Sequence, residues 1–271
     1  MDNRPICFFD SGIGGATILR EVVKLLPNEG YIYYADSINN PYGEKSKEEL
    51  FFIVDSVVSR LLEYNPKVIV CACNTATAMV LGDIRKKYPS VVFVGTEPAV
   101  KVVYDNYRDK QTIVLTTKGT GESEKFLELF HKYETGNCKL VVASELANLI
   151  ENNRDSSFYL SNLLKDYIGA EVVVLGCTHF PLAKNEIRNV LGDVLFVDGS
   201  VGIANRINSL IKKNNGNGYV RIISTSDDVE NKILNIIGKW KVINSFVNNF
   251  YLVLTLLSSS NLTSKNFLLD R

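Results

Sequence analysis

Short apolar runs alternate along the chain with longer segments in which apolar residues recur at helical spacing. Nine runs rich in apolar, β-branched and aromatic residues predict strands: residues 6–9, 31–34, 68–71, 91–94, 112–115, 140–142, 172–175, 194–197 and 219–223. Four intervening segments repeat apolar residues every three or four positions and predict helices: residues 15–26, 46–64, 122–133 and 157–167. Strands that alternate with helices predict an α/β fold with mainly parallel sheets. The nearly continuous apolar character of the strands predicts sheets covered on both faces.

Two breaks in this pattern predict two lobes rather than one wide sheet. Gly95-Thr-Glu-Pro98 and Asp198-Gly-Ser200 each interrupt the alternation. We therefore expect two similar three-layer lobes with mainly parallel sheets. Residues 1–95 and 206–271 form the first, discontinuous lobe, and residues 96–205 form the second. Ligands of parallel α/β sheets bind at the carboxyl ends of the strands, so we expect the active site in the cleft between the lobes.

Composition and charge narrow the class of protein. Of the 271 residues, 46% are hydrophobic and 22% are charged, as is usual in soluble globular proteins. Thirty basic residues balance thirty acidic residues, which gives no electrostatic reason to expect a nucleic-acid or membrane partner. Met1–Phe9 has no room for a secretory signal, and Phe250–Leu257 is far shorter than the roughly 20 residues that span a bilayer. We expect a cytoplasmic protein.

The cysteine count argues against a disulfide framework, because the number is odd: Cys7, Cys71, Cys73, Cys138 and Cys177. A zinc site normally uses cysteines two to four residues apart together with a second pair. Cys71 and Cys73 are separated by one residue, and the chain has only two histidines, so we expect no metal site. Cys71 is expected to pack in a core and His131 to lie on the surface.

Cys73 and Cys177 each follow an apolar strand and are themselves followed by polar residues. One precedes Asn74-Thr75 and the other precedes Thr178-His179. They are about a hundred residues apart, which is a typical lobe length. We therefore expect one cysteine at a strand end in each lobe, with the two thiols facing each other across the cleft.

Two opposed thiols suit the inversion of an amino acid's α-carbon. A thiolate removes the proton from one face, and a thiol delivers a proton to the other. The reference pKa of a cysteine, near 8.5, brings both states within reach at neutral pH. The developing carbanion needs hydroxyls, backbone dipoles and acids around it, and suitable residues are Asp10, Ser11, Thr75, Thr178 and His179. No lysine lies in an obvious Schiff-base motif, which favours chemistry without a cofactor.

Two other readings of these motifs compete with racemisation. Asp10-Ser-Gly-Ile-Gly-Gly15 follows a strand and precedes a helix, and with Asp36 it suggests dinucleotide binding. Thr17, however, stands where that fingerprint needs glycine or alanine, so a simple strand-to-helix turn with Asp10 as N-cap is the stronger alternative. Cys177 and His179 also suggest a hydrolase with a cysteine nucleophile and a histidine base, which leaves Cys73 unexplained.

Four motifs resemble the signatures of bacterial glutamate racemase, in the aspartate/glutamate racemase family, and they occur in the same order and at the same spacing: Asp10-Ser-Gly-Ile-Gly-Gly15, Pro41-Tyr-Gly43, Cys73-Asn-Thr-Ala-Thr-Ala78 and Gly176-Cys-Thr-His-Phe-Pro-Leu182. The resemblance covers about residues 5–238. It implies interconversion of L- and D-glutamate without a cofactor, with Cys73 acting on D-glutamate and Cys177 on L-glutamate. It also implies that Asp10 assists Cys73, that His179 assists Cys177, that the enzyme is a homodimer, and that its D-glutamate feeds peptidoglycan synthesis.

The resemblance also implies a set of substrate-binding residues: Asp10, Ser11, Tyr42, Gly43, Asn74, Thr75, Thr117, Thr120, Thr178 and His179. A family glutamate that assists the second cysteine falls at Glu151, with Glu145 as a competitor. The tail from about Lys239 to Arg271 matches nothing in the family pattern. The chain lacks the long N-terminal extension of members activated by a cell-wall precursor, so we do not expect that regulation. Two alternatives stay open: a sister racemase acting on aspartate, and a non-catalytic amino-acid-binding protein.

Overall fold

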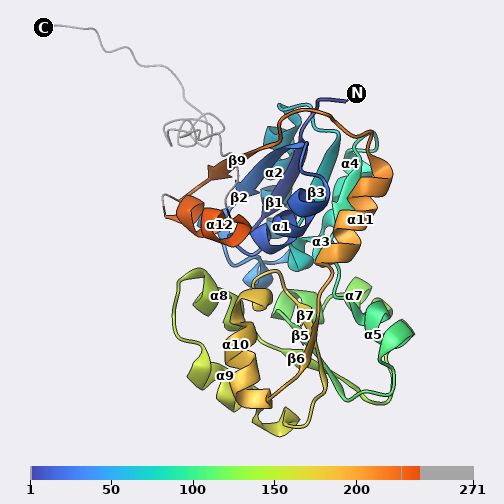
Figure 1. Ribbon diagram of the computed structural model, residues 1–271, viewed down its shortest axis with the longest axis vertical. Helices are drawn as coiled ribbons and strands as arrows, with labels where there is room; N and C mark the ends of the chain where they lie inside the picture. The colour runs from blue at the N-terminus through green and yellow to red at the C-terminus, as the bar shows by residue number, and fades with distance from the viewer. Residues whose placement is uncertain (1, 227, 239–271) are drawn as a thin grey trace, which may run out of the picture.

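The computed structural model describes residues 2–226 and 228–238, and their strands form two separate parallel sheets. We call the five-stranded sheet with its helices the first lobe and the four-stranded sheet with its helices the second lobe. Figure 1 shows the two lobes one above the other, with the first lobe at the top. The predicted α/β class with two parallel-sheet lobes is confirmed.

The first lobe has the strand order β4-β3-β1-β2-β9, and every adjacent pair is parallel. Its strands are β1 (Ile6–Asp10), β2 (Gly30–Ala35), β3 (Val68–Cys71), β4 (Phe93–Gly95) and β9 (Tyr219–Ser224). The central strands β1, β2 and β3 are buried along their whole length, because helices cover both faces of the sheet.

Two hydrophobic clusters lie on opposite faces of this sheet, because alternate side chains of a strand point to opposite sides. One face packs against α1 (Ala16–Leu25), α11 (Ser200–Leu210) and α12 (Val229–Ile237). The other packs against α2 (Lys47–Leu62), α3 (Asn74–Met79) and α4 (Leu81–Lys87). Two short 3-10 helices, η1 (Ser37–Asn39) and η2 (Tyr42–Glu44), follow β2.

The second lobe repeats this arrangement with the strand order β6-β5-β7-β8. Its strands are β5 (Thr112–Thr116), β6 (Cys138–Val142), β7 (Val172–Gly176) and β8 (Leu195–Val197). One face carries α5 (Val100–Asn106) and α7 (Glu124–Tyr133), and the other carries α8 (Leu146–Glu151), α9 (Ser157–Leu164) and α10 (Lys184–Leu191). The shorter elements are α6 (Lys118–Gly121), η3 (Lys165–Tyr167) and η4 (Phe180–Ala183).

The chain crosses twice between the two sheets. It leaves the first sheet after β4 and returns between β8 and α11. The boundary that we expected at residue 205 falls inside α11, whose Ile203, Ala204 and Ile207 pack in the core of the first lobe. We therefore propose that the second boundary precedes residue 200. The part of the predicted first lobe from residue 239 onward, including the tail that matches no family pattern, lies outside the described residues.

Most predicted elements differ from the observed ones only at their ends. The strand expected at residues 91–94 begins at Phe93, and the helix expected at 122–133 begins after Ser123, whose side chain caps it by accepting the Phe126 N–H. The helix expected at 157–167 ends at Leu164 and continues as a 3-10 turn. Within residues 2–226 and 228–238, none of the helices combines the length and apolar character that a membrane crossing requires.

Candidate active site

Cys73 and Cys177 line the same cavity, although they come from different lobes. Cys73 lies just beyond β3 and Cys177 directly follows β7, so each thiol stands at the carboxyl end of a parallel strand. Both residues are buried, with 6% and 7% of their surface exposed, and neither forms a disulfide. The cavity has a volume of about 50 Å³.

Cys177 begins a chain of polar contacts that runs through His179 to Glu151. The Cys177 Sγ lies 3.8 Å from Nδ1 of His179, and Nε2 of His179 lies 2.6 Å from Oε2 of Glu151. Burial alone would lower the pKa of His179, but the Cys177 thiol and the Glu151 carboxylate beside it raise that pKa well above the ordinary value. The raised pKa favours a protonated imidazole between the Cys177 sulfur and the Glu151 carboxyl group.

Glu151 is held in place by the first lobe, although it belongs to the second. Its Oε2 accepts a hydrogen bond from the Ile13 backbone N–H at 3.0 Å, and its carbonyl accepts one from Lys232 Nζ at 2.9 Å. Glu145, the competing glutamate, is exposed and immediately precedes α8 at its N-terminal end. The structure therefore brings Glu151, rather than Glu145, to His179.

The glycine-rich loop after β1 makes room for these second-lobe side chains. A Cβ at Gly12 would lie 2.3 Å from Oε2 of Glu151, and one at Gly14 would lie 2.5 Å from Nδ1 of His179. The space above the loop is therefore filled by a carboxylate and an imidazole. The dinucleotide interpretation of this loop fails for that reason, because a pyrophosphate would need the same space.

Asp10 lies at the end of β1 and is fully buried. Its Oδ2 accepts a hydrogen bond from the Gly15 N–H at 2.8 Å and from the Thr178 hydroxyl at 3.5 Å, while Oδ1 has no partner among the described residues. Burial raises the pKa of Asp10 to about 6, against the opposing effect of His179. A carboxyl group with this pKa exchanges protons readily near neutral pH. Asp10 contacts the backbone of Gly15, as a capping residue does, but also reaches across to the second lobe.

Cys73 differs from Cys177 in its surroundings. Burial and the nearby Asp10 raise the pKa of Cys73 well above the ordinary value. The raised pKa favours the protonated thiol over the thiolate at Cys73. Cys71 is fully buried in the core of the first lobe, and His131 lies on the surface beside Glu134, as predicted.

Three hydroxyl groups join the lobes on the other side of the cavity. Thr75 Oγ1 from α3 lies 2.9 Å from Thr117 Oγ1 and 3.3 Å from Thr120 Oγ1, and the latter two are 3.1 Å apart. All three side chains are buried. Thr75 and Thr117 line the cavity, whereas Thr120 contacts both of their hydroxyl groups from outside the lining. The sequence predicted these residues as substrate contacts but not their contacts with one another.

Five further predicted binding residues line the cavity: Ser11, Tyr42, Gly43, Asn74 and Thr178. Asp10, Thr120 and His179 are buried outside its lining. Tyr42 does not direct its hydroxyl at the cavity, because that group donates a hydrogen bond to Asp36 at 2.7 Å. Six lining residues were not among the predicted site residues: Asn40, Pro41, Glu44, Lys118, Ser144 and Ala147. Ser144 follows β6 closely, so the same strand-end rule that found the cysteines could have found it.

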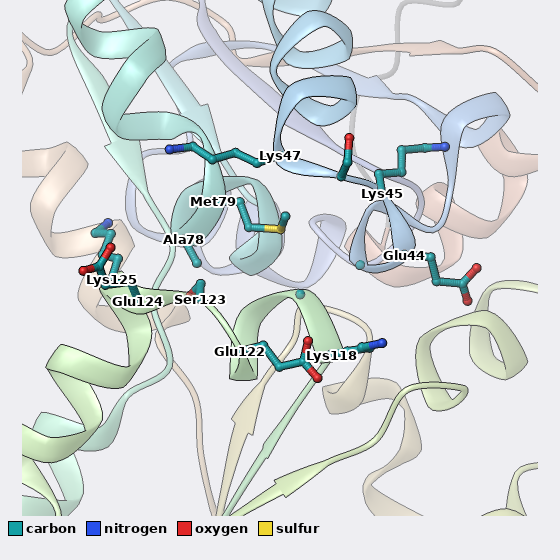
Figure 2. A pocket seen from close by; sticks show the side chains of 13 residues that line it. Glu44, Lys45, Lys47, Ala78, Met79, Lys118, Glu122, Ser123, Glu124 and Lys125 are labelled. Atoms are coloured by element: carbon teal, nitrogen blue, oxygen red, sulfur yellow. The ribbon is translucent and has the colours of Figure 1, made fainter.

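A wider cleft of about 630 Å³ adjoins this cavity and shares Gly43, Glu44 and Lys118 with it. Figure 2 shows Lys47 and Met79 of the first lobe on one side of the cleft and Lys118 and Glu122 of the second lobe on the other. The cleft is therefore the open end of the space between the lobes, and the cavity is its closed end.

Comparison with known proteins identifies the family. Residues 30–205, which include both cysteines, match the family model described as Asp/Glu/Hydantoin racemase. The glutamate racemase of Clostridium botulinum is 38% identical over 223 residues, covering 79% of this chain and 86% of that protein. The glutamate racemase of Clostridium acetobutylicum is 37% identical over 248 residues, covering 86% of this chain and 96% of that protein. This chain belongs to the glutamate racemase family.

The solved structures of this family have the same fold. Escherichia coli glutamate racemase, in complex with L-glutamate and the activator UDP-MurNAc-Ala, matches with a TM-score of 0.76 and 28% identity. The match covers 89% of this chain and 98% of that chain. Members of the glutamate racemase family are isomerases, which decides against the hydrolase and the non-catalytic binding protein as interpretations of the cysteine motifs.

Proposed function

We propose that this enzyme interconverts L- and D-glutamate by proton transfer between two cysteines, without a cofactor. The observation that carries the proposal is the single cavity lined by Cys73 from one lobe and Cys177 from the other. Inversion at the α-carbon needs a base on one face and an acid on the opposite face, and two thiols supply both.

In the direction from L- to D-glutamate, Cys177 acts as the base. Its thiolate takes the α-proton, so the Cα–H bond breaks and an S–H bond forms, while the electron pair remains on the substrate. His179 stabilises the thiolate before this step, and Glu151 holds His179 through the 2.6 Å contact. The raised pKa of Cys73 favours its thiol form, which then donates its proton to the other face. The reverse reaction exchanges the two roles.

Polar groups around the cavity hold the substrate and stabilise the developing negative charge. The free Oδ1 of Asp10 is suited to accept a hydrogen bond from the α-ammonium group. Ser11, Asn74, Thr75 and Thr178 line the same cavity and bring neutral donors to a carboxylate. Neutral donors bind the carboxylate and leave the two thiols as the groups that transfer protons.

We also propose, from the family, that the enzyme is a cytoplasmic homodimer and that its D-glutamate supplies peptidoglycan synthesis. Light scattering of the purified protein during size-exclusion chromatography measures the subunit number directly. A mass equal to that of one chain at micromolar concentration would contradict the dimer and leave the proposed chemistry untouched.

Incubation of the purified protein with L-glutamate in deuterated water tests the proposed function. We expect D-glutamate to form without added cofactor, with deuterium at its α-carbon, as seen by circular dichroism and mass spectrometry. L-aspartate is the comparison substrate. Turnover of aspartate alone would replace the substrate, and D-glutamate without deuterium would rule out exchangeable thiols as the proton carriers.

A further inference from the structure

Lys118 is the one cationic side chain among the described residues that line the cavity with the two cysteines. It begins α6, directly after Thr117, and it also lines the wider cleft outside. Every other residue that lines the cavity is neutral, apart from Glu44 at the same boundary. Lys118 therefore marks the neck where the cleft meets the cavity.

Lys118 differs from the other lysines of the cleft in having no direct partner among the described residues. In the described part of the chain its side chain forms neither a hydrogen bond nor an ion pair. The other three lysines of the cleft each contact a carboxylate: Lys45 pairs with Glu49, Lys47 with Asp83 and Lys125 with Glu97.

The proposed substrate, glutamate, carries a side-chain carboxylate that could pair with the Lys118 ammonium group. An amino acid with two carboxylates carries a net negative charge at neutral pH. Its α-carbon must lie between Cys73 and Cys177, which keeps the α-ammonium and α-carboxylate among the buried donors deep in the cavity. The side-chain carboxylate is the group farthest from the α-carbon, and it is the one that extends toward the neck.

We propose that Lys118 binds the side-chain carboxylate of the substrate at this neck and attracts the anion as it arrives through the cleft. This inference rests on the proposed function, because it takes an acidic amino acid as the substrate. A cavity of about 50 Å³ holds about two water molecules, so the lobes separate to admit the substrate and Lys118 meets it at the opening. An exposed cation at such a rim increases association rates, and salt weakens the effect over a Debye length of about 8 Å.

The contact lies away from the α-carbon, so it contributes equally to binding of the substrate and of the transition state. Lys118→Met is therefore expected to raise KM about tenfold with kcat within about twofold of wild type. Lys118→Arg keeps the charge and should recover most of the loss. The decrease of kcat/KM between low and moderate salt should be clearly smaller in Lys118→Met than in wild type.

Two further variants separate substrate binding from other effects of charge. Lys47→Met removes the same charge from the same cleft, but its partner is Asp83, and it should leave KM unchanged. Glu44→Gln tests whether Lys118 merely offsets Glu44. If it does, the double variant Glu44→Gln/Lys118→Met will have the wild-type KM.

The proposal is overturned by a wild-type KM in Lys118→Met, by a fall in kcat at constant KM, or by full recovery in the double variant. Thermal unfolding of each variant checks that the fold is intact. A wild-type protein that fails to racemise glutamate at all contradicts the proposed function instead, so the two failures are distinguishable.

Discussion

Glu151 Oε2 and His179 Nε2 lie 2.6 Å apart in a buried contact, and the same carboxylate oxygen accepts the backbone N–H of Ile13 from the other lobe. The contact joins the two lobes behind Cys177. It fixes the orientation of the imidazole and supplies one of the charges that raise the pKa of His179. Removal of the Glu151 charge therefore gives the most direct test of this side of the site.

Glu151→Gln should lower kcat/KM by about 10- to 100-fold and shift its pH profile. The Cys177 thiol and Glu151 raise the pKa of His179, so the imidazole stays protonated to a higher pH than usual. Loss of the carboxylate lowers that pKa, and the basic limb of the profile should move to lower pH. Glu145→Gln, at an exposed position, is the matched control. A basic limb that does not move would show that Glu151 leaves the titration of His179 unaffected.

Cys73→Ala and Cys177→Ala should each abolish racemisation, with kcat at least about a hundredfold lower. Each variant lacks either the base or the acid in both directions. Cys138→Ala, at a partly buried position in β6, should keep wild-type kcat. Circular dichroism follows both directions of the reaction. Substantial activity in either of the first two variants would refute the two-base mechanism.

Gly12→Ala should lower activity about as much as Glu151→Gln while leaving the fold intact. The new Cβ would lie 2.3 Å from Oε2 of Glu151, so this carboxylate would have to move away from its partners Ile13 and His179. The contact with His179 would then be lost, so kcat should fall as in Glu151→Gln. Gly82→Ala, in α4 with open space around it, should be neutral or stabilise by about 0.5 kcal/mol. Equal activity in the two glycine variants would contradict this role of the loop.

At neutral pH, Asp10→Asn should lower the activity of the enzyme and raise its free energy of unfolding. Burial raises the pKa of Asp10 to about 6 from its ordinary value of 3.8. Ionisation of Asp10 therefore destabilises the folded state progressively as the pH rises from about 4 through 6, by up to about 3 kcal/mol. Asparagine does not ionise. The free energy of unfolding of the variant, relative to wild type, should rise over this pH range in urea titrations. Parallel pH profiles of stability would be inconsistent with an ionised, buried Asp10.

Lys67→Met should destabilise the first lobe without affecting catalysis. Lys67 and Glu29 form an ion pair with 2% of each side chain exposed. They immediately precede β3 and β2, whereas Cys73 lies beyond the opposite end of β3 and Cys177 lies in the second lobe. Removal of Lys67 leaves a buried, uncompensated carboxylate, which should cost about 3–5 kcal/mol in urea unfolding. Lys67→Met/Glu29→Gln should recover part of that loss. If the single and double variants are equally stable, the Glu29 charge is not the source of the destabilisation.

The pattern of the sequence was sufficient for the nine strands of the described residues, four of their helices, the fold class and the strand-end position of both cysteines. Apolar periodicity reports which faces of a local segment are buried, so strands and helices were predicted to within a few residues. The strand-end rule then placed Cys73 and Cys177 at one edge of each sheet, because all strands of a parallel sheet end on the same side. These inferences use only the pattern of residues within one strand or helix and the residues that directly follow it.

Only the tertiary structure decided which residues from distant parts of the chain surround the two cysteines. Ile13 and Glu151 lie 138 residues apart, and their contact depends on how the lobes pack. The choice of Glu151 over Glu145 follows from that packing, as does the use of the glycine loop to admit a carboxylate instead of a phosphate. The lone charge of Lys118 also became visible only when the residues around the cavity were known. The local pattern of apolar residues determines whether a segment forms a strand or a helix. Contacts between the lobes depend on how all the strands and helices pack together.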